Sequence, residues 1–253
     1  MKMKHILNYF SSVCFLVAFT LVQAQEKSTV KANLDTKALE QTEDSIPVKK
    51  DRYGLRLGID LFKFSRRFYD KNYKGIELTG DFRWNKKYFL AAELGNENKT
   101  TEDDRLTSTS KGSYLKVGFD YNLYENWLDM ENIISIGLRY GFSTFSQELN
   151  GYKIYNPHPY WGELPLIPAN QEFNGLSASW IEVVTGMKAK MLNNVFVGFS
   201  VQLKTLVTNK KPDGFDNLYI PGFNRTYNGN FGIGFNYTVS YFLPLYKKKV
   251  ISK

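Results

Sequence analysis

The chain has 253 residues, a formal net charge of +8 and a single cysteine, Cys14. Because Cys14 lies in a segment that we expect to be removed, disulfides and thiolate metal sites are excluded for the mature chain. The basic residues are not clustered on a recognisable nucleic-acid-binding motif, so nucleic acid is not an expected partner.

The first 24 residues predict a secretory signal peptide. Two lysines precede an apolar run at residues 6–22, and Val22-Gln23-Ala24 is a cleavage pattern of small residues. A membrane-anchoring helix is the alternative, but the run contains polar residues and no charged flank follows it. Gln25 is therefore the expected mature N-terminus of an exported protein.

Residues 25–51 predict a flexible periplasmic leader, because this polar, mixed-charge stretch without aromatic residues cannot bury enough apolar surface to fold alone. Beyond it, large apolar residues alternate with small or polar ones, and no helical apolar stripe of useful length is recognised. A period of two indicates β-strands, here mostly near the ~9–11 residues that a tilted membrane-spanning strand needs. The eight expected strands are Tyr53–Lys63, Lys74–Trp84, Tyr88–Gly95, Ser113–Asn122, Ile133–Ser143, Ser179–Ala189, Val195–Thr205 and Asn230–Leu243.

One face of these strands is apolar. It carries residues such as Leu57, Leu94 and Tyr237, and its only charges are Lys63 and Lys74, at the outer ends of the first hairpin. Tyrosine and tryptophan concentrate near the strand ends, as in the aromatic girdles at the two interfaces of a membrane barrel. We expect this face to contact lipid.

The opposite face carries equal numbers of acidic and basic side chains. An enclosed charge without a partner is costly, so this balance predicts a closed interior in which the charges form a paired network. Eight strands leave room only for side chains inside the barrel. In a soluble sandwich or lipocalin-like barrel, the main alternative, the charged face would be solvated and would need no balance. The twelve residues are Arg56, Asp60, Glu77, Asp81, Arg83, Glu93, Lys116, Asp120, Arg139, Glu182, Lys188 and Lys204.

The connections support a membrane barrel, because long outer loops and short inner turns are typical of that class. The outer loops are expected at 64–73, 96–112, 144–178 and 206–229, and the inner turns at 85–87, 123–132 and 190–194. The predicted fold is all-β, a transmembrane antiparallel up-and-down β-barrel of eight strands over residues 52–246. Ten strands are the alternative if the loop at 144–178 hides a hairpin. Residues 247–253 are expected to form a solvated basic tail.

Three stretches carry a resemblance to a known family: "GIGFNYTVSYFLPL", "SWIEVVTGMKAKMLNNVFVGFSVQLK" and "IPGF". They look like an uncharacterised family of outer-membrane β-barrel proteins from Gram-negative bacteria, over roughly residues 53–246. The resemblance implies an outer-membrane location and a barrel architecture, and it supplies no activity or catalytic residues. The final strand also resembles the assembly signal of such barrels, which implies the barrel-assembly machinery as a partner during insertion.

The sequence offers little for catalysis. His158, the one histidine of the expected mature chain, lies between two prolines, and no spacing ties it to a serine or acid that would complete a catalytic group. We therefore expect no enzyme and no cofactor, with a lipid-modifying enzyme that uses His158 as the alternative. No zinc or calcium ligand spacing occurs.

The loop at 144–178 is the candidate interaction segment, because aromatic residues are interleaved there with prolines. Tyr152, Tyr155, Tyr160 and Trp161 form either a surface patch for a ligand or a cover packed on the barrel mouth. The expected function is structural, adhesive or binding, with outer-membrane lipid around the barrel and an extracellular ligand that the residues do not identify. A narrow channel for small solutes is a further alternative.

Overall fold

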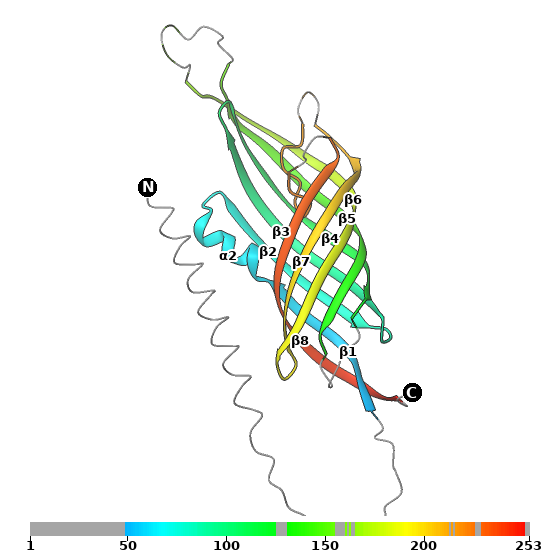
Figure 1. Ribbon diagram of the computed structural model, residues 1–253. Coiled ribbons are helices and arrows are strands. Elements are labelled where there is room, and N and C mark those ends of the chain that lie inside the picture. The colour runs from blue at the N-terminus through cyan, green and yellow to red at the C-terminus, as the bar shows by residue number, and fades with distance from the viewer. Residues whose placement is uncertain are drawn as a thin grey trace, which may run out of the picture. The chain divides into compact units, whose positions relative to one another are not determined.

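The computed structural model describes residues 49–124, 131–154, 160, 162, 165–212, 214, 216–225 and 229–250. Eight antiparallel strands follow one another around a closed barrel in chain order, so the eight-stranded up-and-down fold is confirmed (Figure 1). The strands are β1 (Lys49–Asp60), β2 (Tyr73–Arg83), β3 (Tyr88–Asp103), β4 (Leu106–Asn122), β5 (Ile133–Tyr152), β6 (Ile167–Leu192), β7 (Val195–Asn209) and β8 (Phe231–Val250), with the helix α2 (Leu61–Tyr69) between β1 and β2.

The alternation in the sequence becomes two opposite faces of the barrel wall. Leu78, Leu94, Leu115 and Phe142 lie opposite one another across β2–β5, and their side chains are 51%, 55%, 46% and 46% exposed. Their inward neighbours Glu77, Tyr114 and Ser143 are buried. A soluble barrel would bury its apolar face, whereas here that face is the outer surface and requires lipid around it. The barrel is therefore transmembrane.

The barrel closes through a long pairing between its first and last strands. β1 begins at Lys49, which pairs with Val250, and the pairing continues to Asp60 and Thr238. Residues 49–51 of the expected leader and residues 247–250 of the expected tail are thus strand residues. Pairing satisfies their backbone N–H and C=O groups whatever the charge of their side chains.

Four strands continue far beyond the expected apolar segments on the outer side. β3 and β4 meet in a tight turn at Asp103 and Leu106, and β5 and β6 remain paired out to Tyr152 and Ile167. Much of the expected loops at 96–112 and 144–178 is therefore sheet, which rises above the ends of β7 and β8 (Figure 1). This part carries polar residues on both faces, so it lacks the alternation of apolar and polar residues that predicts a strand. The described residues contain no further strand, so the barrel has eight strands and not ten.

The helix α2 corrects the prediction that the first strand reaches Lys63 and that no helix follows. Asp60 has extended backbone and caps the helix, since its Oδ1 accepts a hydrogen bond from the Phe62 amide at 2.8 Å. The helix ends at Tyr69, and the Asp70 amide donates to the Arg66 carbonyl at 2.9 Å. Within the described residues no helix is long and apolar enough to cross a lipid bilayer.

Candidate functional site

The lumen of the barrel is occupied by charged side chains in close contact. Ten of the twelve residues expected there form ion pairs with one another. Lys116 is at the centre of the larger group, with its Nζ 2.8 Å from Glu93 and 3.3 Å from Glu77. Glu182 links this group to Lys204, whose Nζ lies 3.4 Å from its carboxylate. Since each buried charge faces an opposite one, the desolvation cost of the group is offset by pairing.

Nearer the inner end, two arginines and a lysine hold the remaining acids. Arg56 lies 3.1 Å from Asp81, which also accepts a hydrogen bond from Lys188 at 2.6 Å. Arg139 lies 2.8 Å from Asp120. These pairs cross from strand to strand inside the barrel and so tie the wall together.

Two of the twelve residues have other roles. Asp60 is buried, and among the described residues no base forms an ion pair with it. Besides capping α2, its Oδ1 accepts a hydrogen bond from the Tyr237 amide at 3.3 Å. Arg83 lies at the inner rim, where it donates to the Arg52 carbonyl at 2.8 Å. Both residues secure ends of structural elements and take no part in the central network.

Sequence reasoning missed two charges that complete the network, Lys63 and Glu97. The alternation predicts Lys63 in the lipid-facing register, but the helical turn directs its side chain into the barrel, where its Nζ lies 2.6 Å from Glu77 and 3.0 Å from Glu97. Glu97 was assigned to an outer loop, whereas β3 continues through it and buries its side chain completely. Glu97 continues the inward register of Glu93 by four residues, a signal that an extended strand would have revealed.

The loop between β7 and β8 folds into the outer mouth of the barrel as a plug, which we define as residues 216–225. Glu97 holds it, because its Oε2 accepts hydrogen bonds from the Tyr219 hydroxyl at 2.7 Å and from the Gly222 amide at 3.0 Å. Lys204 donates to the Gly222 carbonyl at 2.7 Å. The network in the lumen and the plug above it are therefore joined by charge-assisted hydrogen bonds.

Gly222 is a position where only glycine fits. Its φ of +82° is in the left-handed region, and a Cβ there would lie 2.5 Å from the ring of Tyr114. The "IPGF" stretch is thus a tight turn pressed against the wall of the lumen.

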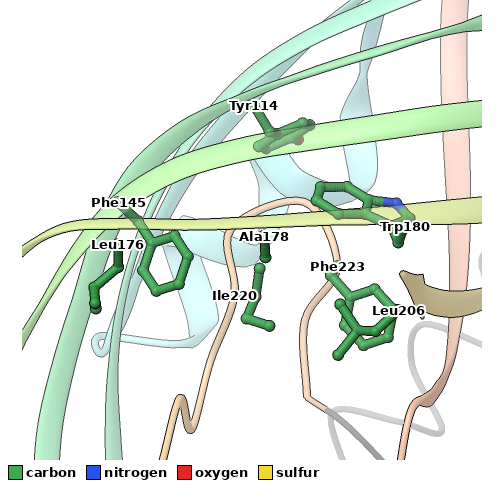
Figure 2. Packing of buried hydrophobic residues seen from close by; sticks show 8 residues of the cluster. All are labelled: Tyr114, Phe145, Leu176, Ala178, Trp180, Leu206, Ile220 and Phe223. Carbon is green, nitrogen blue, oxygen red and sulfur yellow. The ribbon is translucent and has the colours of Figure 1, made fainter. Parts of the chain in front are cut away.

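An apolar cluster at the mouth includes residues of the plug and of the barrel wall (Figure 2). Ile220 and Phe223 of the plug are fully buried, and the Phe223 ring packs edge-on against Trp180 of β6 with centroids 5.8 Å apart. The cluster consists of Tyr114, Phe145, Leu176, Ala178, Trp180, Leu206, Ile220 and Phe223. The cluster packs the plug against the inner wall of the barrel.

At the inner rim, Glu131 joins the turn before β5 to two neighbouring parts of the barrel. It is paired with Arg52, and Lys190 donates to its Oε2 at 3.0 Å. Partial burial works to raise the pKa of Glu131, but the hydrogen bonds from Arg52 and Lys190 outweigh burial and lower the pKa to about 2. Glu131 is therefore ionised at neutral pH and pins this turn.

The aromatic loop is only partly described. Tyr152 lies at the end of β5, paired with Ile167, and both Tyr152 and Tyr160 are exposed. Tyr155 and Trp161 lie outside the described residues, as does His158. In the described part of the chain, no group of three or more histidine, cysteine or acidic side chains is arranged to hold a metal ion.

Comparison with known proteins adds a family. No curated protein sequence matches the chain. A similar solved structure is the crystal structure of Ail, the attachment invasion locus protein of Yersinia pestis, with a TM-score of 0.37 and 11% identity, covering 75% of this chain and 93% of that one. The sequence matches the model of a domain of unknown function, DUF6048, over residues 6–248. As the resemblance of its strands predicted, the chain belongs to an uncharacterised family, DUF6048.

Proposed function

We propose that this protein is a closed barrel of the Gram-negative outer membrane that binds a partner through the sheet it presents outside the cell, and that it has no enzymatic role. Two observations support the proposal. The lumen is filled by paired charges and covered by the plug, so transport is disfavoured. Four strands project beyond the rest of the barrel, so a large surface is available outside.

The projecting sheet leaves one long strand edge uncovered, and this observation carries the proposal. β7 ends at Asn209, next to Ala178, so among the described residues no strand pairs with this edge of β6 from Ile167 to Asn174, and Lys210 donates to the Gly175 carbonyl just below it. On its other side β6 remains paired with β5 out to Ile167. An exposed edge presents unpaired N–H and C=O groups that can pair with an extended segment of another chain. We infer a protein partner that adds a strand there.

Cross-linking on intact cells tests this function. A photo-reactive benzoyl-phenylalanine at Gln171, on the free edge, is expected to give discrete protein adducts that purified protein in nanodiscs competes away. The matched control is the same group at Tyr241, which is exposed on the lipid-facing band. Adducts at Gln171 that are no stronger than those at Tyr241, or that competition leaves unchanged, would rule out this binding edge.

A second expected result concerns the lumen. In planar bilayers the wild-type protein is expected to show no large, steady single-channel conductance, because the charge network and the plug fill the space that ions would need. A porin of wider lumen, reconstituted in parallel, serves as the control. Steady conductance on the scale of that porin would contradict the closed barrel.

A further inference from the structure

The outer half of the barrel wall has a gap between β2 and β8 that a strand does not fill. Pairing of β1 with β8 stops at Asp60 and Thr238, and pairing of β1 with β2 stops at Ile59 and Leu78. Beyond these points β2 continues outward to Tyr73 and β8 to Phe231. The helix α2 lies at this position, in contact with both strands. It replaces the missing outer half of β1 in the wall.

The helix is oriented with its polar side inward and its aromatic side outward. Lys63 points into the lumen, where its Nζ also donates to the Tyr114 hydroxyl at 2.5 Å. Phe64, Phe68 and Tyr69 are 44%, 76% and 66% exposed. A helix on a soluble protein would bury its aromatic side, so the reverse orientation indicates an apolar medium outside.

The aromatic side of α2 continues the lipid-facing band. Phe62 packs against Phe235 of that band with ring centroids 4.3 Å apart. Phe64 and Phe68 form an edge-to-face pair, with centroids 5.8 Å apart, farther along the helix. The apolar surface that contacts lipid on the strands therefore extends without interruption onto the helix.

Basic residues border this aromatic surface on its outer side. Arg66 and Lys99 both pair with Asp70, at 3.0 Å and 2.9 Å. Burial works to raise the pKa of Asp70, but hydrogen bonds from Lys99 and Arg66 outweigh burial and lower it.

Three more bases remain available: Arg67, Lys71 and Lys74 are exposed, and among the described residues none has an ion pair to a carboxylate. Lys74 also stands two residues beyond Ile76, the last apolar residue of β2 on the outward face. Lys74 thus lies where the apolar face of β2 ends and lipid headgroups begin.

We propose that α2 is an interfacial helix that docks phosphate-bearing lipid of the outer leaflet. Phe64, Phe68 and Tyr69 lie at the boundary of acyl chains and headgroups, and Arg67, Lys71 and Lys74 contact lipid phosphate. Aromatic residues at the headgroup level and basic residues against anionic lipid are the two elements of interfacial binding. The proposal concerns the wall of the barrel and is independent of the partner-binding edge.

The depth of the helix is tested first. A fluorescent bimane is attached to Phe68→Cys, in a Cys14→Ser background, and the protein is placed in nanodiscs. Nitroxide-labelled lipid is expected to quench this label to an extent within about twofold of that for the same label at Phe199→Cys, on the lipid-facing band. A label at Gln171→Cys on the outer sheet is the water-exposed control. Quenching at Phe68 that equals quenching at Gln171 would overturn the proposal and leave the aromatic surface open to a protein partner instead.

The phosphate contact is tested with the same label. Replacing part of the phosphatidylcholine by phosphatidic acid is expected to shift the emission of the Phe68 label. In the combined variant Arg67→Gln, Lys71→Gln, Lys74→Gln, the proportion of phosphatidic acid that gives the same emission shift is expected to rise by about tenfold or more. The matched control removes three charges at the inner end, Lys86→Gln, Lys87→Gln and Lys247→Gln, and is expected to change nothing.

Heat-modifiable migration on gels shows that each variant is folded. An equal response in the two triple variants, or no response to phosphatidic acid, would overturn the phosphate contact.

Discussion

Replacing Tyr237 by arginine is expected to destabilise the inserted barrel by about 2–4 kcal/mol and to impair its insertion. Tyr237 is the middle one of the alternating apolar residues between Phe231 and Leu243 of β8, half-exposed on the lipid-facing band and opposite Phe199 of β7. A charge at that depth has lipid around it and no partner. Urea unfolding in lipid vesicles measures the loss of stability, and recovery from the membrane fraction measures insertion.

The neighbouring position supplies the control. Thr238 points toward the lumen and lies beside Gly198. The two residues are so close that a Cβ added to Gly198 would lie 2.6 Å from the Oγ1 of Thr238, so the longer side chain in Thr238→Arg is crowded. The added arginine also finds Asp60, which pairs opposite Thr238 and has an Oδ2 without a hydrogen-bond partner. Thr238→Ser is expected to be nearly silent. A barrel that accepts arginine at Tyr237 and rejects serine at Thr238 would have its faces reversed.

The second large effect is expected at Glu97. Glu97→Ala removes the acceptor that holds the plug and leaves Lys63 with one fewer carboxylate, and breaking such a buried pair typically costs about 3–5 kcal/mol. The Tyr219 hydroxyl and the Gly222 amide lose their partner at the same time. Urea unfolding in vesicles is expected to show the loss, and limited proteolysis is expected to cut the released plug while the barrel strands stay protected.

Replacing Lys63 as well distinguishes the effect of the unpaired charge from the effect of releasing the plug. In Lys63→Leu with Glu97→Ala the lysine that paired with the missing acid is gone as well, so part of the stability is expected to return, while the plug stays open to protease. The control Glu102→Ala removes an exposed acid farther along the same strand and is expected to leave both measurements unchanged. If Glu97→Ala keeps the plug protected, the anchoring role assigned to Glu97 is wrong.

The sequence alone determined the barrel, its eight strands and its two faces. A period of two assigns every residue of a strand to one side, so the sequence by itself predicts Leu94 and Tyr237 outward and Glu93 and Arg139 inward. Charge balance then distinguished a closed lumen from a solvated face, because enclosed charges need partners. These inferences depend on local pattern, and local pattern is what a strand preserves.

Only the tertiary structure decided the contents of the mouth. Whether Lys63 faces lipid or lumen depends on where β1 stops, and that follows from the cap at Asp60 and the gap that α2 fills. Glu97 and Gly222 stand 125 positions apart in the sequence, in segments that read as outer loops, and they meet because the barrel closes around the plug. Such contacts have no period along the chain, since they arise when distant strands enclose a shared space.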